Sequence, residues 1–279
     1  MMDRIALLTG ATSGVGVVVA KRLAREGWLV LAHGRDEARG AQVVGDIETA
    51  GGRARFYGAD LSSMEGVRAL AKAVARDHRH LHLLINNAGI GFGPPDATRQ
   101  ESPDGFELRF AVNYLAPFLL TRLLLPKLVA AAQARIVNVA SIGQRDIDFD
   151  DLQLKRHYSG RDAYRQSKLA LIMFTFDLAE ELKSRGVTVN ALHPATFMDT
   201  FMVREAGGEP MSTVDEGADA IMNLAVSEET RGRTGEYFDG LHPARARRQA
   251  YDERARERLR KITFEVIDLT ARARSPSER

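Results

Sequence analysis

The chain has 279 residues, of which 44% are hydrophobic, so it is long enough to form one α/β domain with a large core. It contains no cysteine, which excludes disulfides, thiolate nucleophiles and cysteine-ligated zinc, and we predict no metal site. The net charge of +2 gives no reason to expect a nucleic acid partner. No run of eighteen apolar residues and no targeting segment stand out, so we expect a cytoplasmic protein without a membrane span.

Short apolar runs alternate with helical patterns along most of the chain. The runs are IALLTG, LVLAHG, RARFYG, LHLLIN, ARIVNVAS and VTVNALHP. This alternation predicts a single α/β domain with a doubly wound parallel sheet and helices on both faces. In such a sheet the ligand lies beyond the carboxyl ends of the strands. We expect residues 1–243 to form the ligand-binding and catalytic domain, and residues 244–279 to add an Arg-rich amphipathic helix to it.

A glycine-rich turn, TGATSGVG, follows the first predicted strand and precedes a helical pattern. Its glycines are Gly10, Gly14 and Gly16. Glycines at a strand-to-helix turn let backbone N–H groups approach a pyrophosphate, which then rests on the positive end of the helix. The spacing differs from the GxGxxG fingerprint, so an ordinary glycine-rich turn remains the alternative.

The second predicted strand ends in LAHGRD. An NAD-binding fold usually has a carboxylate here for the ribose hydroxyls, whereas Gly34 occupies that position in this chain. The next residue, Arg35, can form a forked contact with a 2′-phosphate. Asp36 is predicted to cap the following helix, with Arg39 exposed beyond it. We therefore favour NADP(H) over NAD(H), the alternative being that Arg35 extends into solvent.

Polar residues also follow the third and fourth strands. Asp60, in GADLSS, can accept a hydrogen bond from an adenine amino group, although it or Ser62 can instead cap a helix. The fourth strand runs into NNAG, residues 86–89. Two buried asparagines must satisfy several donors and acceptors, so they either tie the central strands together or line a ligand.

Two further polar residues have positions that suggest chemistry. Asn113 interrupts the apolar helix FELRFAVNYLAPFLLTRLLLPKL, where its amide must be used, for instance to hold a backbone distortion or an ordered water. Ser141, in NVASIG, ends the fifth strand at the same edge as the glycine turn. Its hydroxyl can donate to a substrate carbonyl oxygen, or it is simply a turn serine.

The stretch DAYRQSKLA places Tyr164 and Lys168 four residues apart, on one face of a helix. Lys168 adjoins the apolar stripe of that helix, formed by Leu169, Ile172, Met173, Phe176 and Ala179. An ammonium group held near the phenol favours the phenolate. We therefore expect Lys168, together with the charge of a cationic nicotinamide in the oxidised complex, to lower the pKa of Tyr164 from about 10 toward about 7, so that the tyrosine exchanges its proton near neutral pH.

Together TGATSGVG, NNAG, Asn113, Ser141 and YxxxK resemble the short-chain dehydrogenase/reductase family over residues 4 to 240. The segments FDDLQLKRHYSG, SKLALIMFT and TGEYFDG resemble its retinol-dehydrogenase-like branch. The resemblance implies a Rossmann-type sheet and a nicotinamide dinucleotide. It also implies a tetrad: Asn113 supports a water relay, Ser141 polarises the carbonyl and Tyr164 is the general acid/base. Lys168 binds the ribose and lowers the tyrosine pKa. The implied cofactor contacts are Gly10, Thr12, Ser13, Gly14, Val15, Gly16, Arg35, Asp60, Leu61, Asn87, Ala88, Gly89, Tyr164, Lys168, Pro194 and Thr196.

The chain departs from the family pattern after the sixth strand. Pro194-Ala195 replaces the family's Pro-Gly, and the following threonine comes one residue late, at Thr200. A negative φ at residue 195 would make this change almost free. We also expect this chain to lack the membrane anchor of animal retinol dehydrogenases, so a retinoid substrate does not follow from the resemblance.

The resemblance implies an NADP(H)-dependent oxidoreductase that interconverts a carbonyl and an alcohol. The alternatives are enoyl reduction or epimerisation on the same scaffold, or an NADP-sensing regulator without turnover. We expect an apolar small-molecule substrate between the segments 143–160, 90–97 and 196–212. In the last of these, Phe197, Met198, Phe201 and Met202 form an apolar lid or ordinary packing. Apolar helices at 115–128 and 169–182 are expected to form the seam of a homodimer or homotetramer.

Overall fold

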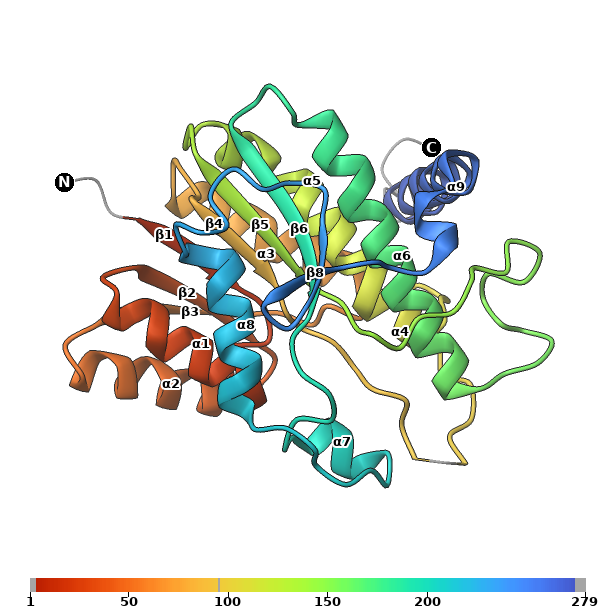
Figure 1. Ribbon diagram of the computed structural model, residues 1–279, viewed down its shortest axis with the longest axis horizontal. Helices are drawn as coiled ribbons and strands as arrows, with labels where there is room; N and C mark the ends of the chain where they lie inside the picture. The colour runs from red at the N-terminus through yellow and green to blue at the C-terminus, as the bar shows by residue number, and fades with distance from the viewer. Residues whose placement is uncertain (1–3, 95, 274–279) are drawn as a thin grey trace.

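The computed structural model describes residues 4–94 and 96–273. Its eight-stranded sheet has the order β3-β2-β1-β4-β5-β6-β7-β8, and every neighbouring pair is parallel except β7 and β8 (Figure 1). The strands are β1 (Ile5–Leu8), β2 (Leu29–Gly34), β3 (Arg53–Gly58), β4 (Leu83–Asn86), β5 (Ala134–Val139), β6 (Val187–His193), β7 (Tyr237–Asp239) and β8 (His242–Ala244). All six predicted runs form strands, so the predicted fold class is confirmed. The two short strands β7 and β8 were not predicted.

Helices cover both faces of the sheet (Figure 1). One face carries α1 (Gly14–Arg25), α2 (Glu37–Thr49) and α8 (Val214–Val226), and the other carries α3 (Met64–Asp77), α5 (Ala116–Val129) and α6 (Gly160–Glu181). The short helix α4 (Leu108–Phe110) and the π-helix η1 (Ala111–Leu115) lead directly into α5. The remaining helices are α7 (Phe201–Glu205), the 3₁₀ helix η2 (Arg248–Tyr251) and α9 (Glu253–Ala273).

Side-chain caps mark where two of these helices begin. Asp36 accepts a 3.0 Å hydrogen bond from the Arg39 amide, which confirms the predicted cap of α2. The cap of α3 is Ser63, which accepts from the Gly66 amide. The alternative that Asp60 or Ser62 caps this helix is therefore wrong. The Asp60 carboxylate instead accepts from the Ser62 amide within the turn.

Helix α6 is buried on nearly all sides. The predicted apolar stripe is confirmed, because Leu169, Ile172, Met173, Phe176 and Ala179 are all less than 8% exposed. Residues on its other faces, Ala170, Leu171 and Phe174 among them, are buried as well. The helix is therefore enclosed by the sheet, α5 and α9, and its polar side chains are held in a rigid environment.

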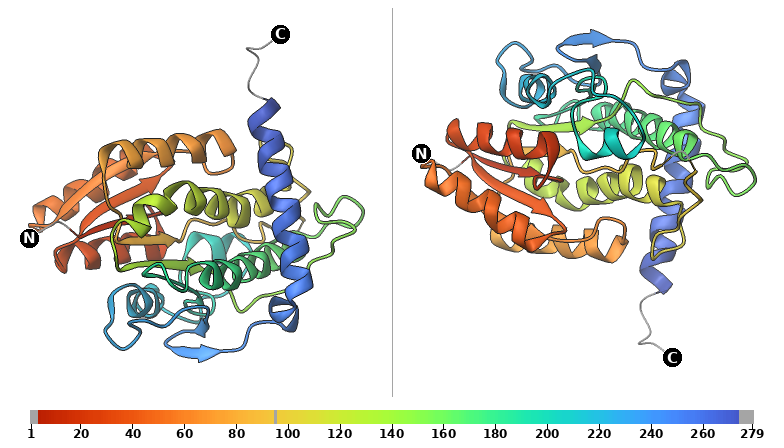
Figure 2. Two further views of the ribbon diagram at one scale, coloured as in Figure 1. Left: turned by 90° about the horizontal axis from the view of Figure 1, so that it is seen from above. Right: turned by 90° about the horizontal axis from the view of Figure 1, so that it is seen from below.

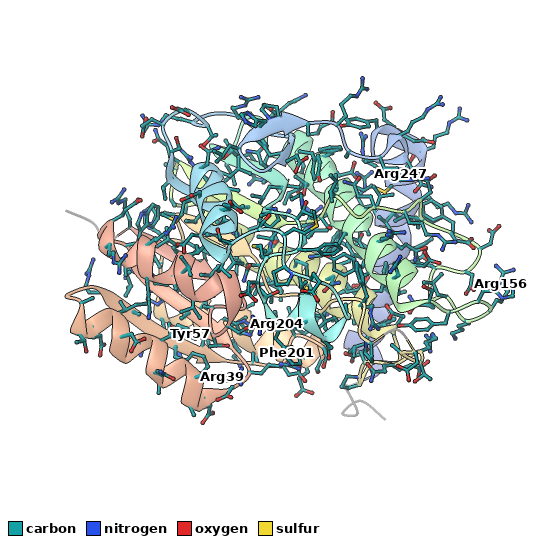
Figure 3. All side chains as sticks on the ribbon, turned by 60° about the horizontal axis from the view of Figure 1, so that its bottom comes forward. Arg39, Tyr57, Arg156, Phe201, Arg204 and Arg247 are labelled. Carbon is teal, nitrogen blue, oxygen red and sulfur yellow. The ribbon has the colours of Figure 1, made fainter. Side chains whose placement is uncertain are left out.

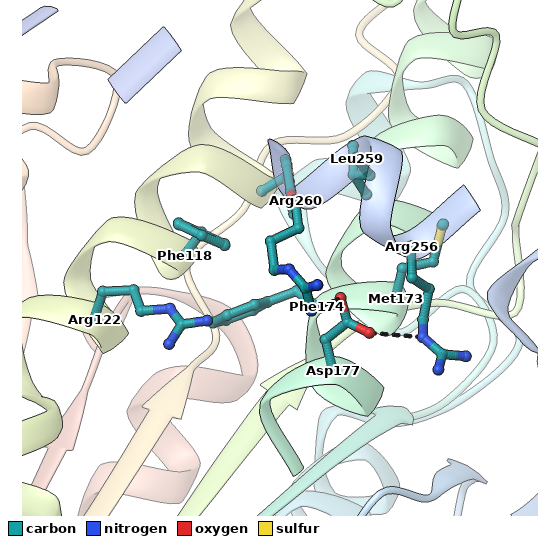
Figure 4. Close-up of a pocket in the computed structure, with 9 residues that line it drawn as sticks. Phe118, Arg122, Met173, Phe174, Asp177, Arg256, Leu259 and Arg260 are labelled. Carbon is teal, nitrogen blue, oxygen red and sulfur yellow. Dashed lines mark hydrogen bonds and ion pairs between the residues drawn. The ribbon is translucent and has the colours of Figure 1, made fainter. Parts of the chain in front are cut away.

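The C-terminal helix α9 crosses α5 and α6 at one end of the molecule (Figure 2). The Tyr114 hydroxyl lies 2.7 Å from Thr263 Oγ1, and the Arg256 guanidinium donates to Asp177 at 2.7 Å in a nearly buried ion pair (Figure 4). The helix predicted in segment 244–279 is thus present. Residues 274–279 and the Leu269 side chain lie outside the described residues, and the domain boundary at 243 stays a prediction.

We expect Leu259→Ala to lower the free energy of unfolding by about 2 to 5 kcal/mol, because Leu259 is 1% exposed and packs into the core beneath α9. Denaturant unfolding measures the loss. Lys261→Ala, at an exposed position two residues further along the same helix, serves as the control and should change stability little. If Leu259→Ala lowered the free energy of unfolding no more than Lys261→Ala does, α9 would contribute no core packing.

The predicted subunit seam is partly covered by the chain's own α9, which packs against Tyr114, Phe118 and Phe174. Within the described residues, one stretch, Leu108–Val129, is long and apolar enough to cross a membrane, and 72% of its most apolar window is buried in the fold. The expectation that no such stretch exists is wrong by these criteria. A buried core helix of a soluble protein meets them equally, so the absence of a span, the cytoplasmic location and the oligomeric state stay predictions.

Candidate active site

The glycine turn between β1 and α1 forms an open cradle of backbone N–H groups. Gly10 and Gly14 have φ values of +67° and +53°, in the left-handed region that favours glycine. A Cβ atom on Gly16 would lie 2.0 Å from the Gly10 carbonyl oxygen. The first residue before the helix, Ser13, is exposed, and its side chain makes no cap hydrogen bond. The N-terminal amides of α1 are thus left for an anionic ligand, and the residues present fit a dinucleotide pyrophosphate.

The asparagines of NNAG hold the sheet edge together. Asn86 donates to Thr121 Oγ1 and to Asn138 Oδ1, which joins β4 to α5 and β5. Asn87 donates through its side-chain amide to the carbonyl oxygens of Thr9 and Gly10, at 2.9 and 3.1 Å. Of the two alternatives, tying the central strands is therefore confirmed for both residues. Contacts of Asn87, Ala88 and Gly89 with a ligand stay predictions.

His33 is a supporting residue that the sequence analysis missed. It is 2% exposed at the end of β2, and burial lowers its pKa to about 4. Its Nδ1 atom accepts from the Gly10 amide at 3.4 Å, while Nε2 lies 3.1 Å from the Ala59 carbonyl oxygen. A neutral imidazole that donates from Nε2 satisfies both contacts. His33 thus links the glycine turn to the end of β3, and a single histidine in an apolar run gave no signal for this role.

The last residue of β2, Gly34, has little room for a carboxylate side chain in its place. A Cβ atom on Gly34 would lie 2.5 Å from Thr12 Cγ2, so any side chain at position 34 must displace Thr12. Arg35 is exposed, and no carboxylate pairs with it in the described part of the chain. Arg39, in contrast, lies 3.4 Å from Asp36. This end of β2 therefore presents one unpaired guanidinium close to the glycine turn.

The remaining predicted contacts near this turn differ in what they can offer. Asp60 is exposed at the end of β3. The Val15 and Leu61 side chains are buried in the two cores, so only their backbone groups are available to a ligand.

Asn113 lies inside the π-helix η1, which confirms that its amide accompanies a backbone distortion. Its Oδ1 atom accepts from the Ile90 amide at 2.9 Å, and its Nδ2 atom donates to the Ile90 carbonyl and to Ser167 Oγ, both at 3.1 Å. Ser167 in turn donates to the Tyr164 carbonyl oxygen at 2.7 Å. Asn113 thus connects the loop after β4 to the helix that carries Tyr164.

Ser141 lies two residues beyond β5 and is 7% exposed. Its Oγ atom accepts from the Gly143 amide at 3.0 Å, which leaves the hydroxyl proton for another acceptor. Its carbonyl oxygen accepts from the Gln144 side chain and from the Tyr237 hydroxyl, so the backbone at this position is held from two sides. Tyr237 lies on β7 and was not predicted to contribute.

Tyr164 and Lys168 lie beside Ser141 and Asn113 at the carboxyl edge of the sheet. The Lys168 ammonium lies 5.6 Å from the centroid of the Tyr164 ring and donates to the Val139 carbonyl oxygen at 2.8 Å. Asn113 and Lys168 lie close to each other beside Gly89. A Cβ atom on Gly89 would be 3.2 Å from Asn113 Oδ1 and 3.4 Å from Lys168 Nζ. The four side chains predicted as a tetrad therefore converge.

In the absence of a bound cofactor, burial raises the pKa of the Tyr164 phenol, and the Ser141 hydroxyl offsets this only in part. Burial also lowers the pKa of Lys168 to about 8, so the ammonium keeps most of its charge at pH 7. The lowering predicted for Tyr164 depends on the charge of a bound nicotinamide as well as on Lys168, so it stays a prediction.

The loop after β6 places Thr200 near the glycine turn. Ala195 does not have a positive φ, whereas Phe197 does, at +45°. Pro194 is buried, and the Thr196 hydroxyl contacts His193 Nε2 at 3.0 Å. A Cβ atom on Gly14 would lie 3.3 Å from Thr200 Cγ2, so Thr200 lies over the glycine turn. The substitution of glycine by Ala195 is thus tolerated without backbone strain at that position.

The four apolar residues of the expected lid divide into two pairs. Met198 lies against Gly217 of α8 and Met202 against Gly91, so both are packed. Phe197 and Phe201 are 43% and 78% exposed. Figure 1 shows α7 beyond the end of the sheet, and Figure 3 labels Phe201 and Arg204 of this helix. Packing therefore explains the methionines, and only the two phenylalanines are available as a lid.

Comparison with known proteins agrees with this geometry. Residues 4–210 match the short chain dehydrogenase family. Human retinol dehydrogenase 13 is 37% identical over 285 residues, covering 95% of this chain and 85% of that protein. Human polyprenol dehydrogenase is 35% identical, covering 96% and 87%. A solved metagenomic short-chain oxidoreductase in complex with NADP shares 29% identity at a TM-score of 0.66, covering 87% of this chain and 98% of that one. The chain therefore belongs to the short-chain dehydrogenase/reductase family, in its retinol-dehydrogenase-like branch.

Proposed function

We propose that this protein is an NADP(H)-dependent oxidoreductase that interconverts a carbonyl and an alcohol, with Tyr164 as the general acid/base. The observation that carries the proposal is the convergence of Asn113, Ser141, Tyr164 and Lys168 beside the glycine cradle. A bound NADP(H) supplies the hydride in reduction and accepts it in oxidation.

The side chains divide the remaining work. In reduction, the Tyr164 phenol donates its proton to the substrate oxygen, and the Ser141 hydroxyl donates a hydrogen bond to the same oxygen. The raised pKa of the buried phenol keeps Tyr164 protonated, which suits an acid. Lys168 would donate to a ribose hydroxyl of the bound cofactor, and its charge, 5.6 Å from the Tyr164 ring centroid, would stabilise the phenolate left after proton transfer. Asn113 holds the loop and helix in register through Ile90 and Ser167.

The choice of NADP(H) over NAD(H) is supported by two observations at the end of β2. Arg35 is exposed and has no carboxylate partner in the described residues, and a carboxylate side chain at position 34, which would accept from ribose hydroxyls, would have to displace the Thr12 side chain. A solved relative of similar length was obtained as an NADP complex.

We propose an apolar alcohol or its carbonyl as the substrate class. Two relatives are named for the apolar alcohols retinol and polyprenol. The exposed Phe197 and Phe201 beyond the sheet edge are suited to cover an apolar chain. The test is NADPH oxidation with a panel that contains short ketones, aryl ketones and long-chain aldehydes including retinal. Turnover that rises with chain length supports the class, and turnover of polar carbonyls only contradicts it.

Lys168→Met should remove activity and weaken NADP binding, yet raise the Tm of the cofactor-free protein by a few degrees at pH 7. Burial lowers the folded-state pKa of Lys168 to about 8 from its ordinary value of 10.5. Below pH 8 the folded protein must therefore bury an ammonium group, which costs stability. The cost decreases as the pH rises from 8 to 10.5, where both folded and unfolded states become neutral.

Thermal melts at several pH values, with titration calorimetry for NADP, measure both effects. The Tm advantage of Lys168→Met should be largest below pH 8 and shrink above it. Lys183→Met, at an exposed position beyond the same helix, is the control and should show no such pH dependence. Loss of kcat without a change in NADP affinity would remove the ribose contact from the proposed role of Lys168.

A further inference from the structure

A buried arginine that the proposed reaction does not use binds the loop beside the active site. Arg109 lies on α4 and is 3% exposed. Its Nε atom donates to the Gly91 carbonyl oxygen at 2.8 Å, and its Nη2 atom donates to the Phe92 carbonyl oxygen at 2.6 Å. Its Nη1 atom donates to the Tyr158 hydroxyl at 2.6 Å. One guanidinium thus joins the loop after β4 to the segment that precedes α6.

The charge of Arg109 is compensated within the same cluster. Glu107 Oε1 lies 3.5 Å from Arg109 Nη1 and accepts from the Tyr158 hydroxyl at 3.1 Å. Glu107 Oε2 accepts from the Phe110 amide at 2.8 Å, so the carboxylate also caps α4. A buried ion pair adds little net stability compared with apolar packing, because both charges lose their hydration. The main effect of the Arg109–Glu107 pair is therefore to fix the positions of the neighbouring groups, not to add stability.

Two glycines clear the space that this cluster needs. A Cβ atom on Gly93 would lie 2.6 Å from Arg109 Nη2, and a Cβ atom on Gly160 would lie 2.2 Å from the Phe92 carbonyl oxygen. One turn further along the helix, Asn113 binds both backbone groups of Ile90. Residues 90–92 are consequently held through three consecutive carbonyl oxygens by side chains from a single helical segment.

The fixed loop places an aromatic ring directly against the general acid/base. The Phe92 ring meets the Tyr164 ring edge to face, with centroids 4.7 Å apart and an interplanar angle of 88°. The guanidinium of Arg161, which lies on α6, is 5.8 Å from the centroid of the Phe92 ring. A substrate whose oxygen reaches Tyr164 must therefore place one of its carbonyl substituents beside Phe92.

We propose that Phe92 is a specificity-determining wall of the carbonyl pocket, and that Arg109, supported by Glu107 and Tyr158, is the positioning residue that holds it there. The inference rests on the proposed carbonyl chemistry at Tyr164. Arg109 is buried and does not touch the substrate. Substitutions at Arg109 should nevertheless change substrate choice by moving Phe92, which carbonyl chemistry at Tyr164 alone does not require.

The test is a double-mutant cycle on Phe92→Ala and Arg109→Lys, with kcat/KM measured for a bulky aryl ketone and a small aliphatic ketone. Phe92→Ala should shift the ratio of the two values toward the bulky ketone by about tenfold, the size of a modest pocket change. Arg109→Lys should shift it in the same direction, because a single ammonium cannot hold two carbonyl oxygens and a phenol together. In the Phe92→Ala background, Arg109→Lys should have almost no further effect. Tyr158→Phe, which removes one hydroxyl, should give a smaller shift of the same sign.

Arg256→Lys is the matched control, since Arg256 is also a buried, paired arginine but lies on α9, where it pairs with Asp177. It should lower Tm without changing the ketone ratio. Additive effects of Phe92→Ala and Arg109→Lys, or an unchanged ratio in Arg109→Lys, would overturn the proposal.

Hydrogen exchange of the backbone amides of residues 89–93 gives a readout that does not depend on turnover. Exchange there should be faster in Arg109→Lys and unchanged in Arg256→Lys. If the wild type reduces no carbonyl, the proposed function fails, and this measurement still decides whether Arg109 positions the loop. Unchanged exchange in Arg109→Lys would overturn that positioning role.

Discussion

Tyr164→Phe should reduce kcat by about 10² to 10⁴ while leaving NADP affinity nearly unchanged. The substitution removes only the hydroxyl, and with it the proton that the substrate oxygen must receive. The ring remains, so its edge-to-face contact with Phe92 and its place in α6 are preserved. Steady-state kinetics with NADPH and any ketone turned over by the wild type measure the loss, and titration calorimetry measures the affinity.

Tyr57→Phe is the matched control for removal of a partly buried phenol. Tyr57 lies on β3, an edge strand of the sheet, and its hydroxyl donates to the Asp77 carboxylate. Burial raises the pKa of Tyr57 to about 12. This variant should lose some stability and keep its kcat. If Tyr164→Phe retains a tenth of the wild-type kcat on a good substrate, Tyr164 is not the general acid/base.

Arg35→Ala should weaken NADP binding roughly ten- to a hundredfold and leave NAD binding almost unchanged. A charge-assisted contact with the 2′-phosphate is worth about 1.5 to 3 kcal/mol, and NAD lacks that phosphate. Titration calorimetry of both dinucleotides on both proteins gives the two ratios. The wild type should bind NADP more tightly than NAD, and the variant should lose most of that preference.

Arg25→Ala controls for the loss of one exposed positive charge, because Arg25 ends α1 away from the glycine turn. It should leave both affinities unchanged. Similar wild-type affinities for NAD and NADP would defeat the cofactor proposal while leaving the fold and the tetrad intact.

A reversal of cofactor preference by Gly34→Asp with Arg35→Ile is expected to be incomplete. The new carboxylate repels the phosphate, but its Cβ atom meets the Thr12 side chain at 2.5 Å. The double variant should therefore reject NADP more clearly than it gains NAD. Thr12→Ala in the same background should recover part of the NAD affinity, and the same calorimetric titrations measure it. No recovery would show that Thr12 does not limit the substitution.

Local patterns in the sequence were sufficient to predict the sheet and the position of each motif along it. Six apolar runs predicted six strands, Asp36 was predicted to cap a helix, and Asn113 was predicted to use its amide for a backbone distortion or an ordered water within an apolar helix. These features depend on residues within one or two turns of each other, so spacing alone reports them. The position of Ser141 at the same edge as the glycine turn also followed, because the carboxyl ends of parallel strands meet at one edge. Its grouping with Tyr164 and Lys168 was predicted from the family resemblance.

Only the tertiary structure decided the environment of those residues. Burial by segments distant in the sequence raises the pKa of Tyr164 in the cofactor-free protein, and no local pattern indicated this desolvation. The Thr12 side chain lies in the space that a side chain at position 34 would need, and α9 covers part of the predicted seam. Arg109 donates to the hydroxyl of Tyr158, which is 49 positions away in the sequence. Desolvation and buried pairing depend on which distant side chains share a volume, and periodicity along one chain carries no information about that.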